Sequence, residues 1–228
     1  MGEEFLNVSD EWRRAYPGAA QGILVMDGVV NPPEAPQLDW QKEALEAQLR
    51  ERYASYDRAS LLGLPILQAY HAYYKGFDKT YHLLLQLESV VFKHKSIPRV
   101  AALVEVMFMA ELEDLLLTAG HDLAAVRQPL RLDVADGEEL YTLLRGDAQQ
   151  LKRGDIFVAD AVGVISSILY GPDARTQINP DTHRVFFTTY APPGIGSQAV
   201  LDHLGNIERK VIYIAPTARV ELLKVVEA

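Results

Sequence analysis

The chain has 228 residues, 49% of them hydrophobic, so it can bury a substantial core and is not expected to be disordered over most of its length. It contains no cysteine, which excludes disulfides, thiolate metal sites and a cysteine nucleophile. The formal net charge of −9 opposes non-specific attraction to phosphates, so an RNA partner would have to be held by a local basic patch and by shape.

The residue patterns indicate a cytoplasmic protein with no membrane partner. The stretch Met1–Pro17 carries acids and a Trp-Arg-Arg run where a signal peptide needs an apolar core. The longest apolar run, Val100–Leu117, is interrupted by four acidic residues, a density that a membrane-spanning helix does not tolerate. The absence of cysteine suits a reducing compartment.

The N-terminal half is predicted to be mainly helical. Ser9 can cap a short helix that runs to Tyr16, and residues 21–30 have the pattern of a strand. Further helices are expected at 39–55, from Pro65 to Gly76, at 81–93 and at 99–118. The last of these is predicted to be buried, although its first residues could also form a strand.

The chain after His121-Asp122 is predicted to be rich in short strands. The expected strands are Leu130–Val134, Leu140–Leu144, Asp155–Asp160, Val162–Tyr170 and Arg184–Tyr190. Glycine or aspartate lies in each intervening cluster, as turn conformations require. Ser197 can cap a helix to about Leu204, and the runs Val211–Ile214 and Val220–Val226 finish the chain. This segregation predicts an α+β fold, with 1–228 as a single domain.

Several fragments in the central part of the chain occur in a characteristic order. They are Ile97–Val100 with Val104-Glu105 and His121–Leu123, Gly137–Leu143, Gly154–Asp160, Ile168–Gly171 with Arg175–Ile178 and Thr182, and Phe186–Pro192. In order and spacing they resemble the B3/4 domain, the tRNA-editing domain of the phenylalanyl-tRNA synthetase β subunit, over about 95–195. The resemblance implies a free-standing homologue with a layered fold, in which a β-sandwich of unusual topology is flanked by helices. Residues 1–94 would then be an N-terminal helical extension and 196–228 a C-terminal extension.

The family's domain hydrolyses tyrosine wrongly attached to the phenylalanine tRNA, in a pocket with a histidine, glycine backbone and a strand glutamate. By position these match His121, Gly171 and Thr188. Thr188 is neutral and shorter than the family's glutamate, and the family's Arg- and Gly-containing run after that strand has no match in 194–209. The tyrosine-specific site is therefore not expected to be intact, because function resides in the site rather than in the fold.

The resemblance also suggests roles for individual residues. In a catalytic site, His121, Thr182 and Thr188 would orient a water that attacks an aminoacyl ester, and backbone amides near Gly171 would stabilise the oxyanion. The residues expected to bind the ligand are Gly171, Arg175, His183, Arg184 and Tyr190. Among these, His183 and Arg184 could grip a carboxylate or phosphate together with Thr182, or could simply begin a solvated strand after a turn.

Two other patterns allow alternatives. His121-Asp122 could form a surface turn after a helix, with Gly120 as the helix C-cap. The aromatic and basic stretch Tyr70–His82 could stack bases or could pack helices together. No metal site is expected, because Glu111 and Asp114 lack a histidine at ligand spacing, and no cofactor motif occurs.

Two functions therefore stay open at the level of sequence. One is an RNA-associated editing-like domain, not a full synthetase, that binds or hydrolyses a mischarged aminoacyl-tRNA in trans. Its partner would be tRNA or aminoacyl-tRNA held by a local patch, with no DNA expected. The other is a non-catalytic module that kept the fold and binds a small amino-acid-like ligand or a protein partner.

Overall fold

The computed structural model describes residues 5–228. Met1–Glu4, the start of the stretch that is expected to lack a signal peptide, lie outside the described residues.

The helices are α1 (Asp10–Ala15), α2 (Asp39–Arg52), α3 (Arg58–Leu62), α4 (Pro65–Lys75), α5 (His82–Val91), α6 (Ala102–Asp114) and α7 (Ser197–Ile214), with a 3₁₀ turn η1 (Pro36–Leu38) before α2. The strands are β1 (Leu6–Val8), β2 (Ala20–Asp27), β3 (Leu117–Asp122), β4 (Leu130–Val134), β5 (Leu140–Thr142), β6 (Ala148–Gln150), β7 (Ile156–Ala159), β8 (Val164–Ser167), β9 (Gly171–Pro172), β10 (Arg184–Ala191) and β11 (Arg219–Glu227). Within 5–228, no helix combines the length and apolar character needed to cross a membrane.

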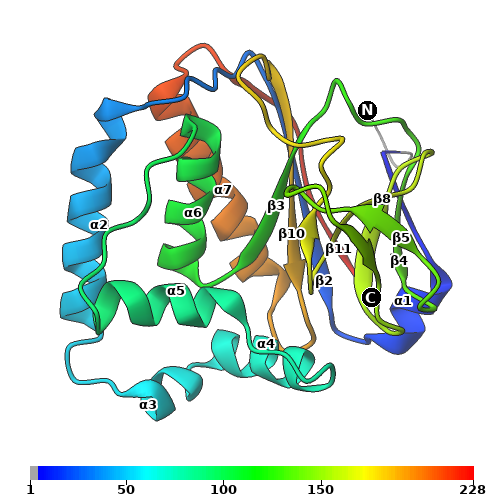
Figure 1. The fold of residues 1–228 in the computed structure, drawn as a ribbon, viewed down its shortest axis with the longest axis horizontal. Helices are drawn as coiled ribbons and strands as arrows, with labels where there is room; N and C mark the ends of the chain where they lie inside the picture. Colours follow the sequence, from blue (N-terminus) through cyan, green and yellow to red (C-terminus); the bar gives the residue numbers. More distant parts are fainter. Residues whose placement is uncertain (1–4) are drawn as a thin grey trace.

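The strands form two main sheets, and helices cover the outer face of one of them (Figure 1). The four-stranded sheet has the order β11-β2-β10-β3, and the five-stranded sheet has the order β1-β4-β7-β8-β9. Helices α6 and α7 pack on the four-stranded sheet, and the five-stranded sheet lies on its other side. β5 and β6 form a separate hairpin. The fold is therefore α+β and layered, and most helices precede β3, as predicted.

Strand β10 lies in the interior of the four-stranded sheet and is antiparallel to both of its neighbours, β2 and β3. Its side chains alternate between the two faces. Phe187 and Thr189 face the helices, and Phe186, Thr188 and Tyr190 face the second sheet. Every residue of β10 except Arg184 is buried. Any functional group from Val185 to Ala191 is therefore part of the protein interior.

Segments from both ends of the chain complete the two sheets. Strands β2 and β11 make up half of the four-stranded sheet, and β1 pairs in parallel with β4 at one edge of the five-stranded sheet. The region 95–195 is thus joined to β1 and β2 by strand pairing, and β11 joins the same sheet through β2.

Many predicted elements are confirmed, with ends that differ by a few residues. The Ser9 side chain accepts a hydrogen bond from the Trp12 amide at 3.0 Å and caps α1, and Pro65 is the first residue of α4. The turn glycines Gly137 and Gly146 have φ values of 96° and 92°, which glycine adopts without strain. Helix α7 continues beyond the expected end at Leu204, so the run Val211–Ile214 is its last turn.

The prediction of a helix over 99–118 is correct for α6 and wrong for its end. Leu115 takes a left-handed conformation with φ 63°, which ends the helix, and β3 begins at Leu117. The Glu111 carboxylate accepts a hydrogen bond from the Thr118 amide at 2.7 Å and so links the helix end to the strand. The surface turn suggested for His121-Asp122, with Gly120 as a helix cap, is also wrong, because all three residues belong to the buried strand β3.

Gly22 lets α7 approach the sheet closely. A Cβ atom at this position would lie 2.6 Å from Val200 Cγ1 and 3.0 Å from Leu204 Cδ1, both on α7.

We predict that Gly22→Ala lowers the free energy of unfolding by about 1–3 kcal/mol, because overpacking forces the helix away. Gly205→Ala, in the interior of α7, is the matched control. Its new methyl group meets no atom closer than 3.5 Å, and it should raise stability by about 0.5–1 kcal/mol. Urea denaturation of both variants measures these changes, and a Gly22→Ala protein as stable as the wild type would contradict the close packing.

Candidate functional site

His121 lies between the two sheets in a chain of buried hydrogen bonds. Its Nδ1 is 2.8 Å from the Thr176 hydroxyl, and its Nε2 is 3.1 Å from the Ser166 hydroxyl. Thr176 also donates to the Asp173 carboxylate, and the Tyr190 hydroxyl is 2.6 Å from Ser166 Oγ. All five side chains are buried. The resulting chain runs Tyr190, Ser166, His121, Thr176, Asp173.

The partners assign the tautomer of His121. Because the Thr176 hydroxyl donates its hydrogen to Asp173, its oxygen accepts from His121 Nδ1–H. Nε2 then carries the lone pair and accepts from Ser166. Burial lowers the pKa of His121 to about 3, and the Arg175 guanidinium also lowers it, while Asp160 opposes this change. The ring is therefore neutral at physiological pH, and its basic nitrogen already has a donor.

Thr188 is held by the neighbouring strand. The Gln21 amide donates to its hydroxyl at 2.5 Å, and the hydroxyl contacts the Gly22 carbonyl at 3.3 Å. Its side chain is fully buried. No hydrogen bond joins Thr188 to His121 among the described residues. The position that matches the family's glutamate is therefore occupied by a short side chain within a packed interior.

The segment Thr182–Arg184 forms a turn and the start of β10. The buried Thr182 hydroxyl accepts from the Asn179 amide at 2.9 Å, so it stabilises the turn. His183 is exposed. The Arg184 guanidinium pairs with Glu221 at 2.6 Å and with Asp27 at 3.8 Å. A carboxylate or phosphate bound by Arg184 would have to compete with both acids.

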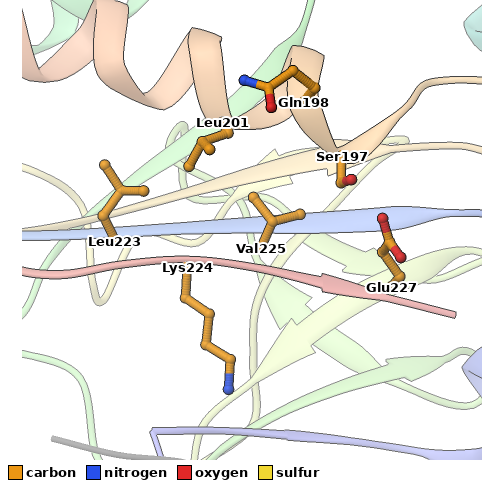
Figure 2. A pocket seen from close by; sticks show the side chains of 7 residues that line it. All are labelled: Ser197, Gln198, Leu201, Leu223, Lys224, Val225 and Glu227. Atoms are coloured by element: carbon orange, nitrogen blue, oxygen red, sulfur yellow. The ribbon is translucent and has the colours of Figure 1, made fainter.

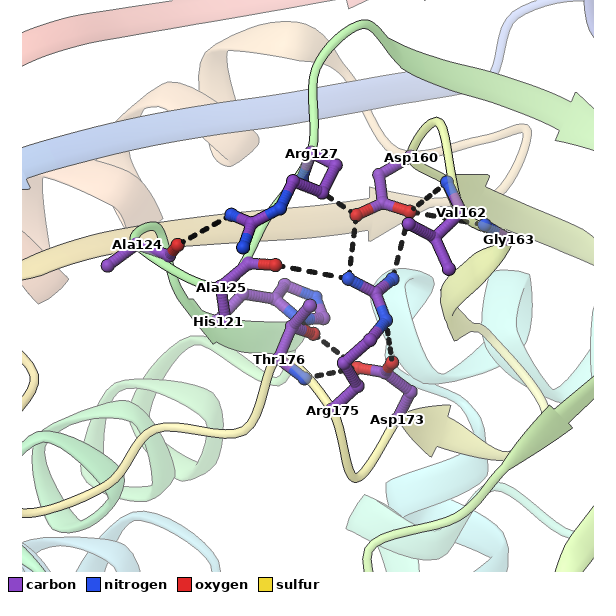
Figure 3. A network of polar contacts seen from close by, with 10 residues as sticks. All are labelled: His121, Ala124, Ala125, Arg127, Asp160, Val162, Gly163, Asp173, Arg175 and Thr176. Atoms are coloured by element: carbon purple, nitrogen blue, oxygen red, sulfur yellow. Dashed lines mark hydrogen bonds and ion pairs between the residues drawn. The ribbon is translucent and has the colours of Figure 1, made fainter.

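Arg175 forms hydrogen bonds with the segments that contain Ala125 and Asp160 (Figure 3). Its guanidinium donates two hydrogen bonds, of 2.9 and 2.8 Å, to the Asp160 carboxylate and a third, of 3.1 Å, to the Ala125 carbonyl. Asp160 in turn accepts from the amides of Arg127, Val162 and Gly163. This bidentate pair fixes the loops beside His121, so Arg175 has few donors left for a ligand.

Gly171 is the first residue of β9, directly after the turn from β8, and it is half-buried. It pairs with Ser167, one residue along from the Ser166–Pro172 pair, and its carbonyl accepts from the Tyr141 hydroxyl at 2.9 Å. Its φ is 79°, and a Cβ atom would meet nothing within 4 Å. Gly171 therefore faces open space, in contrast to the buried side chains of His121, Thr182, Thr188 and Tyr190.

The residues on either side of Gly171, Tyr170 and Pro172, line a pocket of about 420 Å³ that we call the Gly171 pocket, although Gly171 itself is not a lining residue. It is lined by Lys79, Leu143, Leu144, Arg145, Gln149, Leu169, Tyr170 and Pro172. Lys79 Nζ lies 4.5 Å from the centre of the Tyr170 ring, within the range of a cation–π contact. Arg145 forms an ion pair with Asp147, and both side chains are largely exposed. Two cations, one aromatic ring and one amide thus surround an open pocket in an otherwise acidic protein.

The amides around Gly171 are mostly engaged. The Tyr170 amide donates to Ser167 Oγ at 3.2 Å, and the Asp173 amide donates to the Ile165 carbonyl at 2.7 Å. Pro172 has no amide hydrogen. The oxyanion site expected near Gly171 therefore has few free donors in this arrangement.

A second pocket, of about 400 Å³, lies where the start of α7 meets β11 (Figure 2). Ser197, Gln198 and Leu201 approach it from the helix, and Leu223 and Val225 from the strand, whereas Lys224 points away. None of the residues expected to be functional lines this pocket. Within residues 5–228, no three His, Asp or Glu side chains are grouped closely enough to share a metal ion.

The aromatic stretch 70–82 packs the helices. Tyr70, Tyr73, Tyr74 and Tyr81 are buried, and Tyr70 stacks on Tyr81 with ring centres 4.1 Å apart. The Tyr70 hydroxyl also accepts from the Leu117 amide. The packing alternative is therefore correct for these rings, and Lys79 alone extends from this stretch into the Gly171 pocket.

A second cluster of buried polar side chains surrounds His203, and no sequence pattern predicts it. His203 of α7 bonds Asp114 through Nδ1 and Thr118 through Nε2, each at 2.8 Å, and Thr118 contacts Thr189 at 2.9 Å. These residues are far apart in the sequence and share no motif. His203, Thr118 and Thr189 are buried, so this cluster joins α6, α7 and the sheet instead of facing a pocket.

Comparisons with known proteins leave the family open. No family model matches the chain, and neither does any curated protein. Among solved structures, it is similar to an N-terminal fragment of the phenylalanyl-tRNA synthetase β subunit from Pyrococcus horikoshii, with a TM-score of 0.46 and 11% identity. The match covers 98% of this chain and 54% of that chain, so this protein spans about half the length of the fragment. The editing-domain resemblance therefore stays a prediction.

The lowered pKa of His121 predicts a pH dependence of stability. Between pH 6.5 and about 3, His121 is protonated in the unfolded state and neutral in the folded state, so stability falls as the pH falls through this window. This histidine alone should reduce the free energy of unfolding by about 2 kcal/mol between pH 7 and pH 5. His121→Asn should remove that part of the dependence, and His183→Asn, which alters an exposed ring, should not. Urea denaturation at both pH values tests this, and equal pH slopes for wild type and His121→Asn would contradict it.

Proposed function

We propose that this protein is a non-catalytic, RNA-associated binding domain that holds the aminoacyl end of a tRNA in the Gly171 pocket. The observation that carries the proposal is the grouping of Lys79, Arg145 and Tyr170 around an open pocket beside Gly171. Cations and an aromatic ring suit the phosphate and the base of an RNA 3′ end. The amide of Gln149 adds a hydrogen-bonding group for the ester or the amino acid.

Three of the lining residues, Leu143, Leu169 and Tyr170, come from fragments that carry the sequence resemblance, whereas Lys79, Arg145 and Gln149 lie outside those fragments. Leu143 forms an isolated bridge with Asp173, and the Ala174 amide donates to the Thr142 carbonyl at 2.9 Å. The Tyr141 hydroxyl reaches the Gly171 carbonyl. The fragments Gly137–Leu143 and Ile168–Gly171, which resemble separate parts of the editing domain, therefore meet here. Their contact supports a ligand of the class that the resemblance implies.

Burial argues against hydrolysis by the residues that match the family's site. His121, Thr182 and Thr188 are each fully buried, and each hydroxyl or ring nitrogen has a partner. A general base must reach the proton that it abstracts, directly or through one water. The lone pair of His121 accepts from Ser166 and faces the protein interior. Positioning roles within the fold therefore suit these residues better than contact with a substrate.

Removal of the two pocket cations should weaken RNA binding. We expect Lys79→Ala with Arg145→Ala to reduce the affinity for an aminoacyl-tRNA about tenfold or more at low salt. The slope of log affinity against log salt should fall by about 1.4, because two phosphate contacts to a single strand are lost. The control, Lys93→Ala with Lys224→Ala, removes two exposed cations outside this pocket and changes the net charge equally. Fluorescence anisotropy of labelled tRNA measures both pairs, and equal effects of the two pairs would contradict a specific pocket.

A deacylation assay separates binding from hydrolysis. The purified protein, incubated with a panel of mischarged tRNAs, should release no amino acid faster than buffer does. Release from one tRNA that is abolished by His121→Asn or by Thr188→Ala would show an editing hydrolase and overturn the non-catalytic part of the proposal. Binding lost with Lys79 and Arg145 would still support the Gly171 pocket in that case.

A further inference from the structure

A second aromatic and basic groove is lined by residues of α2, α6 and α7. Figure 1 shows these three helices on one side of the four-stranded sheet. It has a volume of about 350 Å³, and we call it the Trp40 groove. Its lining residues are Trp40, Gln41, Ala44, Leu45, Gln48, Met109, Glu113, Asn206, Arg209, Lys210 and Tyr213. It shares no residue with the Gly171 pocket, which lies at the turn between β8 and β9.

The groove follows the direction of its helices. Helix α2 contributes residues 41, 44, 45 and 48, and α7 contributes 206, 209, 210 and 213. This spacing of three or four residues places each set on one side of its helix. Seven residues of α-helix rise about 10 Å, so the walls extend over roughly that length. An elongated ligand fits this shape better than a compact one.

Trp40 is unusually exposed for a tryptophan. Its side chain is 72% exposed, whereas Trp12, the other tryptophan of the chain, is 1% exposed. Tyr213 is 49% exposed, and its hydroxyl lies 3.4 Å from the Gln37 carbonyl at the start of η1. Large aromatic side chains are normally well covered, so two exposed rings in one groove are a notable apolar surface. Exposed rings of this kind serve as platforms on which bases stack.

The lining of the groove carries a net positive charge, whereas the chain as a whole is negatively charged. Lys210 pairs with Glu113 at 2.9 Å. Arg209 is exposed and takes part in no ion pair with residues 5–228. The lining therefore carries two cations and one acid, against a net charge of −9 for the chain. Arg209 is available to an anionic partner, and phosphate matches the fork of its guanidinium.

We infer that the Trp40 groove binds a single strand of RNA, with a base stacked on Trp40 and a phosphate held by Arg209. The inference rests on the proposed function in that the ligand is an RNA, but it concerns a separate surface and needs no aminoacyl group. The polar walls favour RNA over a protein partner. Gln41 and Gln48 offer amides that can bond base edges, whereas the core of a protein interface is apolar and depleted in charge.

Tryptophan fluorescence gives a direct test with a 12-nucleotide oligoadenylate that carries no amino acid. Because Trp12 is buried and Trp40 is exposed, saturable quenching by the oligonucleotide reports contact with Trp40. By anisotropy of the labelled oligonucleotide, Trp40→Ala should weaken binding at least about fivefold, and Trp40→Phe, which keeps a ring, should weaken it less. Arg209→Gln should lower the salt slope by about 0.7. Lys93→Gln, which alters an exposed cation outside the groove, is the control, and circular dichroism verifies that each variant folds.

The outcomes distinguish this groove from the Gly171 pocket. Loss of oligoadenylate binding with Trp40 and Arg209, but not with Lys79 and Arg145, supports the groove whatever happens to aminoacyl-tRNA binding. Absence of quenching, or equal affinity of wild type and Trp40→Ala, overturns the inference even if the Gly171 pocket binds aminoacyl-tRNA. Self-association that Trp40→Ala abolishes, in sedimentation without RNA, would show a protein interface and would also overturn it.

Discussion

The burial of strand β10 from Val185 to Ala191 is the constraint on which the rest of the structure depends. Both edges of the strand are paired, with β2 and β3, and both faces are covered, by α7 on one side and by the five-stranded sheet on the other. Polar groups on this strand must therefore find partners inside the protein. Thr188 finds Gln21, Thr189 finds Thr118, and Tyr190 finds Ser166. A ligand has access to the turns at the ends of the strands, not to the strand itself.

The same constraint explains the state of His121. A charged imidazole between two sheets would lose its hydration, so burial lowers the pKa of this ring and keeps it neutral. Its two nitrogens then need one donor and one acceptor, which Ser166 and Thr176 supply. The hydrogen-bond chain stabilises one arrangement of the two sheets, and it leaves His121 no lone pair for a water. His121 is thus buried with both ring nitrogens hydrogen-bonded to neighbouring side chains.

Local patterns allowed a good part of the fold to be predicted, and non-local contacts account for the rest. The Ser9 cap, the Pro65 start of α4 and the turn at Gly146 depend on neighbouring residues, so the sequence reveals them. The end of α6 depends on Leu115 in a left-handed conformation that leucine rarely adopts, and no local signal marks it. The pairing of β2 with β10, the burial of Thr188 and the approach of Lys79 to Tyr170 join distant segments. The order of the sequence fragments suggested site roles for His121, Thr182 and Thr188, but it could not predict that these three side chains are buried.

Binding of the aminoacyl end in the Gly171 pocket can be tested directly by an NMR titration with an amide-linked 3′-aminoacyl-adenosine, which mimics the tRNA end and lacks the ester. We expect the largest amide shift changes at Tyr170, Gly171 and Gln149, with saturation, and little change at the amides of His121 and Thr188. Largest changes at His121 and Thr188 would show that the ligand enters between the sheets, and would contradict both the pocket and the structural role of the histidine. No change at any amide would contradict binding of the aminoacyl end altogether.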